Sequence, residues 1–147
     1  MGLPALERKL KGVARATRLP LLQIKGYEIL SRGAEDWIFR EAEVLSEGRM
    51  EGDHYQGSTM ITADFTRAEA IFRGPPTVED LERLAAAARY SVRVHLRAIR
   101  LAKAEAYRRF PERHLGEATV AVDVQVRRGK LQIDVDLDIP CPSTNGD

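Results

Sequence analysis

The chain has 147 residues, of which 44% are hydrophobic and 31% are charged, and its net charge is +1. These values are ordinary for one globular domain that can bury a core without disulfides or a structural metal. Nothing in these totals suggests a disordered chain, a collagen-like chain or a coiled coil. The longest apolar runs are a few residues, far below the ~20 that a transmembrane helix needs, so we expect no membrane partner.

The cysteine content indicates the compartment. Cys141 is the only cysteine, so it cannot form a disulfide within the chain, and a cysteine-based zinc site is excluded. This content fits a reducing environment. No apolar segment typical of a signal peptide lies near the N-terminus. We therefore expect a cytoplasmic protein.

The N-terminal part of the chain predicts helices. Segment 1–18 predicts a basic helix, whose positive residues are Arg8, Lys9, Lys11, Arg15 and Arg18. Residues 20–33 predict a second helix, opened by Pro20 and capped by Gly33. A strand is nearly as well supported there, because the interior Gly26 disfavours a helix and its neighbours favour β-structure.

The centre of the chain predicts a helix, a loop and a strand. Residues 34–47 favour a helix over a strand, since apolar side chains recur on one helical face. Residues 49–57 form a polar, glycine-flanked stretch and predict a loop. Residues 59–65 alternate as a strand with Ile61, Ala63 and Phe65 inward, followed by a bulge or by a helical turn that begins at Thr66.

The strongest helical signal covers residues 77–110. Thr77 and Asp80 form a capping box at its start, and Pro111 ends it. An unbroken helix of this length would measure roughly 50 Å, which exceeds the ~30 Å width of a domain of this size. Three side chains beside its main apolar face predict an interface with another subunit, and these are Tyr90, Val94 and Leu101.

Residues 118–139 predict a C-terminal β-hairpin. Apolar and polar residues alternate on both sides of the turn 127–130, which leaves one apolar face and one acidic, solvated face. The tail 140–147 is polar and predicts a flexible end. The expected fold is therefore α+β, in a single domain over 1–139. It has N-terminal helices, an antiparallel sheet with the C-terminal hairpin, and one long helix packed on the sheet.

Two groups of residues are candidates for chemistry. Three carboxylates project from one face of the second hairpin strand, Asp134, Asp136 and Asp138. Oxygen ligands of this kind bind hard divalent cations, but alternating polar residues are also what any solvated sheet face presents. His54 lies beside carboxylates and titrates near neutral pH, which suits acid–base catalysis. No nucleophile motif accompanies His54, and most histidines in such positions are solvated bystanders.

A row of arginines on the predicted long helix is the third candidate, and it comprises Arg89, Arg93, Arg97 and Arg100. Such a row can contact nucleic-acid phosphates. It is also typical of the solvated face of an amphipathic helix, and the net charge is close to zero.

The sequence contains no P-loop, dinucleotide-binding fingerprint or EF-hand loop, and no cofactor is predicted. We therefore favour a non-enzymatic interaction or assembly domain that forms a homodimer or a larger homo-oligomer. The reasons are the predicted helix, which is longer than the domain is wide, and the uneven charge distribution, which has an acidic stretch at 28–53. The alternatives are a nucleic-acid-binding accessory protein that uses the arginine row, and a small divalent-metal-dependent hydrolase that uses His54 and the aspartates.

Overall fold

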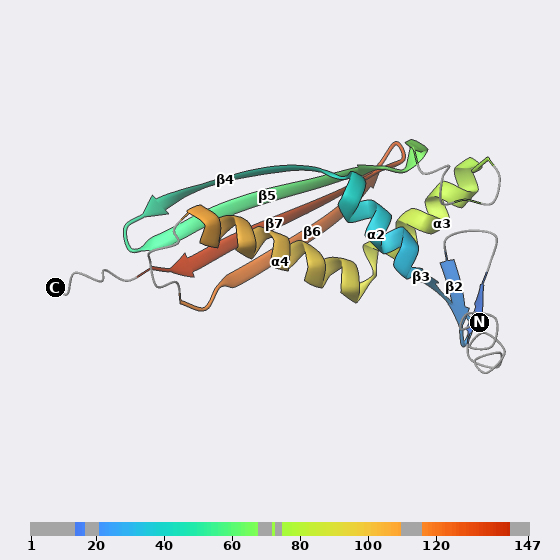
Figure 1. Cartoon of the computed structure of the whole chain (residues 1–147), viewed down its shortest axis with the longest axis horizontal. Coiled ribbons are helices and arrows are strands. Elements are labelled where there is room, and N and C mark those ends of the chain that lie inside the picture. The colour runs from blue at the N-terminus through green and yellow to red at the C-terminus, as the bar shows by residue number, and fades with distance from the viewer. Residues whose placement is uncertain (1–13, 17–20, 68–71, 73–74, 110–115, 142–147) are drawn as a thin grey trace. The chain divides into compact units, whose positions relative to one another are not determined.

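The computed structural model describes residues 14–16, 21–67, 72, 75–109 and 116–141. Two compact units make up the chain. The first comprises Met1–Ala42, Ala63–Ser91 and Val126–Leu131, and the second comprises Glu43–Thr62, Val92–Gln125 and Gln132–Asp147. Helices and antiparallel strands are mixed throughout (Figure 1), which confirms the predicted α+β class.

The first unit begins with a three-stranded antiparallel sheet of β1 (Ala14–Ala16), β2 (Leu21–Ile24) and β3 (Tyr27–Leu30). Lys25 and Gly26 join β2 to β3, and both have positive φ, +50° and +85°. Two consecutive residues of this kind form the turn that matches the twist of a tight hairpin. The helix predicted for residues 20–33 is therefore wrong, and the strand alternative is confirmed.

The basic helix predicted for segment 1–18 is contradicted where it can be compared. Ala14–Ala16 is strand β1, which pairs with β2 through the register Ala14↔Ile24 and Ala16↔Leu22. Pairing with a neighbouring strand overrides the local helical pattern at these residues. The remainder of the segment lies outside the described residues.

Helix α2 (Arg32–Glu41) follows, with Ser31 as its N-cap, whose side chain accepts a hydrogen bond from the Ala34 amide at 3.1 Å. The helix ends six residues earlier than predicted, because the chain is extended from Ala42 and enters a strand. Trp37 of α2 packs against Phe65 with ring centroids 6.1 Å apart, in the core of the first unit.

Helix α3 (Val78–Arg89) also belongs to the first unit. The predicted capping box is confirmed: the Thr77 hydroxyl accepts from the Asp80 amide, and the Asp80 carboxylate accepts from the Thr77 amide. The Arg83 guanidinium donates to both carboxylate oxygens of Glu28 and so ties α3 to β3.

The helix predicted for 77–110 is two helices, because α3 ends at Arg89 and α4 (Val92–Arg109) starts after Ser91. The Tyr90 and Ser91 amides still bond to carbonyls of α3. Beyond the break, Val94 is fully buried, although the sequence places it beside the main apolar face, and Val92 is 68% exposed. Local propensity allows a continuous helix, but each half buries its own face in a different unit.

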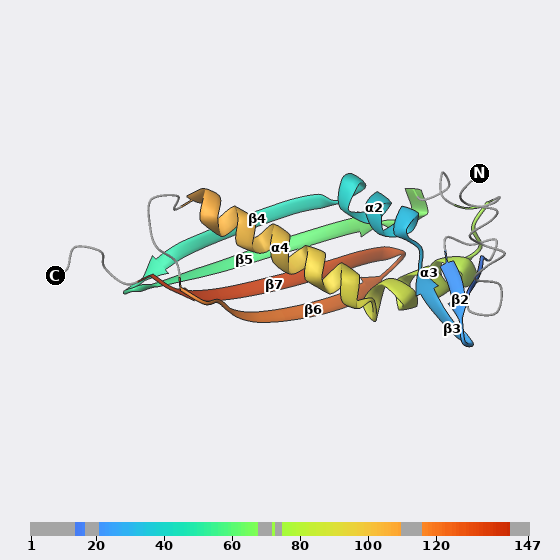
Figure 2. The same ribbon diagram turned by 60° about the horizontal axis from the view of Figure 1, so that its bottom comes forward.

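The second unit contains α4 and most of a four-stranded sheet of order β4-β5-β7-β6. Its strands are β4 (Glu43–Glu51), β5 (His54–Asp64), β6 (Thr119–Arg127) and β7 (Lys130–Pro140). Helix α4 lies along one face of this sheet (Figures 1 and 2). The β6–β7 hairpin confirms the C-terminal hairpin, with Arg128 and Gly129 at positive φ in its turn.

The strand predicted within 59–65 is confirmed as part of β5, with Ile61, Ala63 and Phe65 buried. The loop predicted for 49–57 is wrong, since β4 extends to Glu51 and β5 begins at His54. Only Gly52 and Asp53 connect them, and Gly52 has φ +65°. A glycine at the first central position is typical of a two-residue hairpin turn.

A buried tyrosine holds β4 and β5 together on the face that α4 covers. Gly48 and Gly57 lie directly opposite each other in the two strands, and the Tyr55 ring lies over both. A methyl group on Gly48 would be 2.0 Å from Tyr55 Oη, and one on Gly57 would be 2.7 Å from Tyr55 Cε1. The ring therefore occupies space that only paired glycines leave free.

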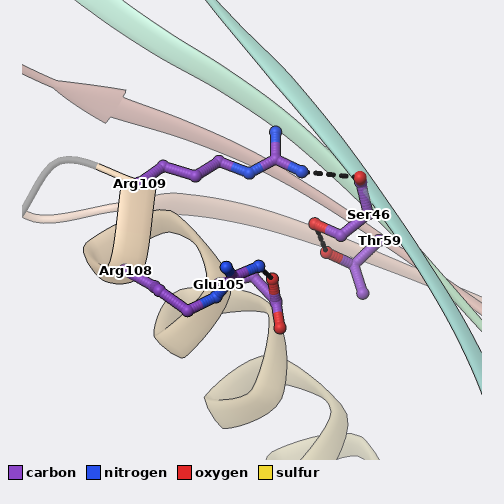
Figure 3. Close-up of polar contacts among 5 residues, drawn as sticks. All are labelled: Ser46, Thr59, Glu105, Arg108 and Arg109. Carbon is purple, nitrogen blue, oxygen red and sulfur yellow. Dashed lines mark hydrogen bonds and ion pairs between the residues drawn. The ribbon is translucent and has the colours of Figure 1, made fainter.

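The C-terminal end of α4 is fixed to the sheet by a polar contact (Figure 3). The Arg109 guanidinium donates to the Ser46 carbonyl at 2.6 Å, and the Thr59 hydroxyl donates to the Ser46 hydroxyl at 3.3 Å. Arg108 pairs with Glu105 one turn earlier on the helix. Positive side chains at a helix C-terminus also interact favourably with its dipole.

The predicted flexible tail is contradicted at its first two residues. Pro140 closes β7, and buried Cys141 donates its amide to the Asp53 carbonyl at 2.7 Å. The remainder of the tail lies outside the described residues.

Candidate functional site

The face of the four-stranded sheet that α4 does not cover, which we call the open face, carries His54 and the three candidate aspartates. The strand register assigns side chains to it by alternation, because successive residues of a strand point to opposite faces. Apolar β7 side chains such as Ile133 and Val135 are buried on the helix side. The aspartates between them therefore lie on the open face, as the sequence predicts.

A hollow of about 700 Å³ lies on the open face, and we call it the sheet hollow. Residues from all four strands line it. They are Glu47, Gly48, Arg49, Gln56, Gly57, Ser58, Thr119, Ala121, Asp136, Leu137 and Asp138. Three of these side chains are carboxylates and one is a guanidinium. The local charge is therefore negative, although the chain as a whole is nearly neutral.

His54 and Asp138 meet at the edge of the sheet hollow. His54 Nδ1 lies 2.6 Å from Asp138 Oδ1, and the nitrogen donates this hydrogen bond because a carboxylate can only accept. Asp53 is also close, with its Oδ1 3.7 Å from His54 Nε2. The hydrogen bond to Asp138 raises the pKa of His54, and the negative charges of both aspartates raise it further.

The other aspartates of the predicted row have different surroundings. Asp134 accepts a hydrogen bond from Gln132 Nε2 at 3.0 Å, while Asp136 is exposed in the sheet hollow. Among the residues that the structure describes, no group of three or more histidine, cysteine, aspartate or glutamate side chains could hold a metal ion.

The predicted arginine row does not lie on one helix. Arg89 is the last residue of α3, and its guanidinium carbon lies 5.6 Å from the centre of the Tyr90 ring. Arg93, Arg97 and Arg100 belong to α4 in the other unit. The break at Tyr90–Ser91 divides the row, so the predicted continuous stripe on a single helix is wrong.

The predicted interface patch is divided in the same way. Tyr90 is 75% exposed and follows α3, whereas Leu101 is half-buried on α4. Val94 is fully buried within its own chain and offers no surface to a partner.

Sequence reasoning missed the β4 and β5 side of the hollow, namely Glu47, Arg49, Gln56 and Ser58. Glu47 falls in the segment 34–47 that predicts a helix, Arg49 and Gln56 fall in the segment 49–57 that predicts a loop, and Ser58 lies just before the predicted strand. The pair Gly52-Asp53 between two alternating segments was the available signal, since glycine followed by a polar residue is typical of a hairpin turn.

Comparisons with protein-family models, with curated proteins and with solved structures found no match for this chain. None of the helices in the described part of the chain has both the length and the apolar character needed to cross a membrane. The fold is α+β, and its four-stranded sheet carries a polar hollow on the open face.

Proposed function

We propose that this chain is a non-enzymatic interaction domain that binds a positively charged partner on the open face of its four-stranded sheet. The observation that carries the proposal is the sheet hollow, which is lined from four strands and contains three carboxylates against one arginine. Its volume of about 700 Å³ falls in the range of about 300–1,000 Å³ that is usual for ligand sites.

The chemistry of the lining favours an ammonium or guanidinium group. Carboxylates form short, charge-assisted hydrogen bonds with both groups. Asp136 and Asp138 come from one strand and Glu47 from another, so they can contact a cation from two sides. Gln56 and Ser58 lie between them and add uncharged hydrogen-bonding groups.

Binding of a hexa-arginine peptide, measured by calorimetry and by NMR amide shifts, tests the proposal. We expect the double variant Asp136→Asn, Asp138→Asn to weaken binding at least tenfold, because two charge-assisted hydrogen bonds are worth more than about 1.4 kcal/mol. The shifted amides should be those that line the sheet hollow.

Asp123→Asn is the matched control, since Asp123 is an exposed residue on the open face but does not line the hollow. It should change the affinity less than threefold. An equal loss in both variants would mean that the peptide responds only to general negative charge, and the proposal would then be wrong.

A second candidate function is acid–base catalysis, favoured by the 2.6 Å hydrogen bond between His54 and Asp138. A carboxylate that orients an imidazole is a recurring arrangement of general bases. Ser58 is four residues along the same strand, about 13 Å away, and so cannot be the nucleophile that His54 activates. Any hydrolysis would use water. Turnover of nitrophenyl acetate or nitrophenyl phosphate that His54→Gln abolishes would support this candidate.

A further inference from the structure

Helix α4 exposes apolar side chains, with basic side chains among them, on the side turned away from the sheet. Val92, Leu96 and Tyr107 are 68%, 48% and 47% exposed. Their spacing places them on one side of an α-helix, whereas buried Val94 and Ala98 lie on another. We call the exposed side, with the positive residues beside it, the α4 outer face. Those positive residues are Arg93, Arg97, Arg100 and Lys103.

The open face of the sheet has the complementary arrangement. Leu45 of β4 and Met60 of β5 are directly opposite each other in the register, and Leu45 is 54% exposed. They form an apolar patch on one side of the open face. The aspartates of β7 lie on the next strand, so apolar and acidic side chains are adjacent there, as apolar and basic side chains are adjacent on α4.

We propose that the α4 outer face of one copy of this chain docks on the open face of a second copy. The inference rests on the proposed function, because it identifies the positively charged partner of the open face as the chain itself. The dimensions agree: the 18 residues of α4 span about 27 Å, and the 9–11 residues of the strands span roughly 30–37 Å.

Electrostatic repulsion disfavours a symmetric dimer in which like faces pair. Two α4 outer faces would bring arginines together, and two open faces would bring carboxylates together, and both arrangements are repulsive. Contact between unlike faces is head-to-tail, so each bound copy still offers one free face of each kind. Such assembly adds further copies until a ring closes or a filament forms.

The contact area predicts weak association. The footprint of α4 is about 27 Å by about 10 Å, well below the ~800 Å² that each partner buries in a stable complex. Because most of the attraction is between exposed charges, added salt should weaken it. We therefore expect assembly only at high protein concentration and low ionic strength.

Sedimentation velocity with two complementary variants tests the inference. Variant A carries Asp134→Asn and Asp136→Asn and keeps the His54–Asp138 hydrogen bond, and variant B carries Arg93→Gln and Arg100→Gln. Wild type should form species larger than a dimer as its concentration rises in low salt, and these should dissociate in about 0.5 M salt, where screening is strong. Each variant alone should remain monomeric, because each lacks one of the two faces.

A mixture of A and B should give a discrete 1:1 dimer, since one intact α4 outer face meets one intact open face and each of the other two faces has lost two charges. Arg40→Gln removes an exposed arginine from α2 and is the control for loss of positive charge. It should assemble like wild type.

Three results would overturn the inference: a monomeric wild type at millimolar concentration, variants that assemble like wild type, or no dimer in the mixture. If wild type stays monomeric but binds hexa-arginine in the sheet hollow, the proposed function holds and the second copy is not its partner. If Arg93→Gln, Arg100→Gln instead abolishes binding to anionic vesicles or duplex DNA, the α4 outer face has a different occupant.

Discussion

Substitution of Gly48 by alanine should destabilise the second unit through a single clash. The new methyl carbon would lie 2.0 Å from Tyr55 Oη and 2.4 Å from Cζ. Non-bonded heavy atoms rest at about 3.5–4.0 Å, so the ring would have to move by about 1.5 Å. Tyr55 is 1% exposed and also lies against Gly57, which limits that movement. We expect a loss of about 3 kcal/mol, at the upper end of the usual cost of overpacking.

Urea unfolding followed by far-UV circular dichroism measures this loss, and a double-mutant cycle with Tyr55→Leu assigns it to the ring. In the Tyr55→Leu background the clash is gone, and Gly48→Ala should be neutral or stabilise by up to about 1 kcal/mol, since alanine costs less entropy than glycine on folding. The coupling energy should therefore be about 3–4 kcal/mol. Gly33→Ala is the matched control, because nothing lies within 4 Å of its added methyl group in α2. It should stabilise by about 0.5–1 kcal/mol.

If Gly48→Ala costs the same with tyrosine and with leucine at position 55, the ring does not occupy the space above the glycine pair, which contradicts the expected clash. A change in the dependence of unfolding on urea, without a change in midpoint, would also contradict it, because a clash in the native state shifts the midpoint.

Three further predictions follow from single contacts. Asp138→Asn should lower the pKa of His54 in an NMR titration, because it removes the charge and the hydrogen bond that raise this pKa in the wild type. The His54–Asp138 pair should stabilise the fold fully below about pH 6.5, the ordinary pKa of histidine. This stabilisation should be lost as the pH rises through the raised pKa of His54 in the folded state. Thr77→Ala should cost about 1 kcal/mol in urea unfolding, because it removes the capping box of α3. The Glu28–Arg83 pair is partly exposed, so a double-mutant cycle on it should give at most about 1 kcal/mol, and less in high salt; a larger value would show that the pair is shielded from solvent.

Two kinds of pattern could be recognised in the sequence alone: a strict alternation of apolar and polar residues, and a capping motif with a fixed spacing. Valine and isoleucine alternate with polar residues along β6 and β7, which determined the hairpin and placed the aspartates on its solvated face. The capping box at Thr77 and Asp80 determined the start of α3, because its hydrogen bonds join residues three positions apart. Both signals depend only on neighbours in the chain.

Contacts between distant segments decided the rest. His54 and Asp138 are 84 positions apart and meet only because β5 and β7 are neighbours in the sheet. The sheet hollow likewise needs all four strands. The sequence predicts a helix and a loop over most of β4, and a loop over the first part of β5. The sequence has no proline or glycine, the usual helix-breaking residues, at the break between Tyr90 and Ser91. The break follows from the burial of different faces by α3 and α4, which depends on tertiary packing and not on local helix propensity.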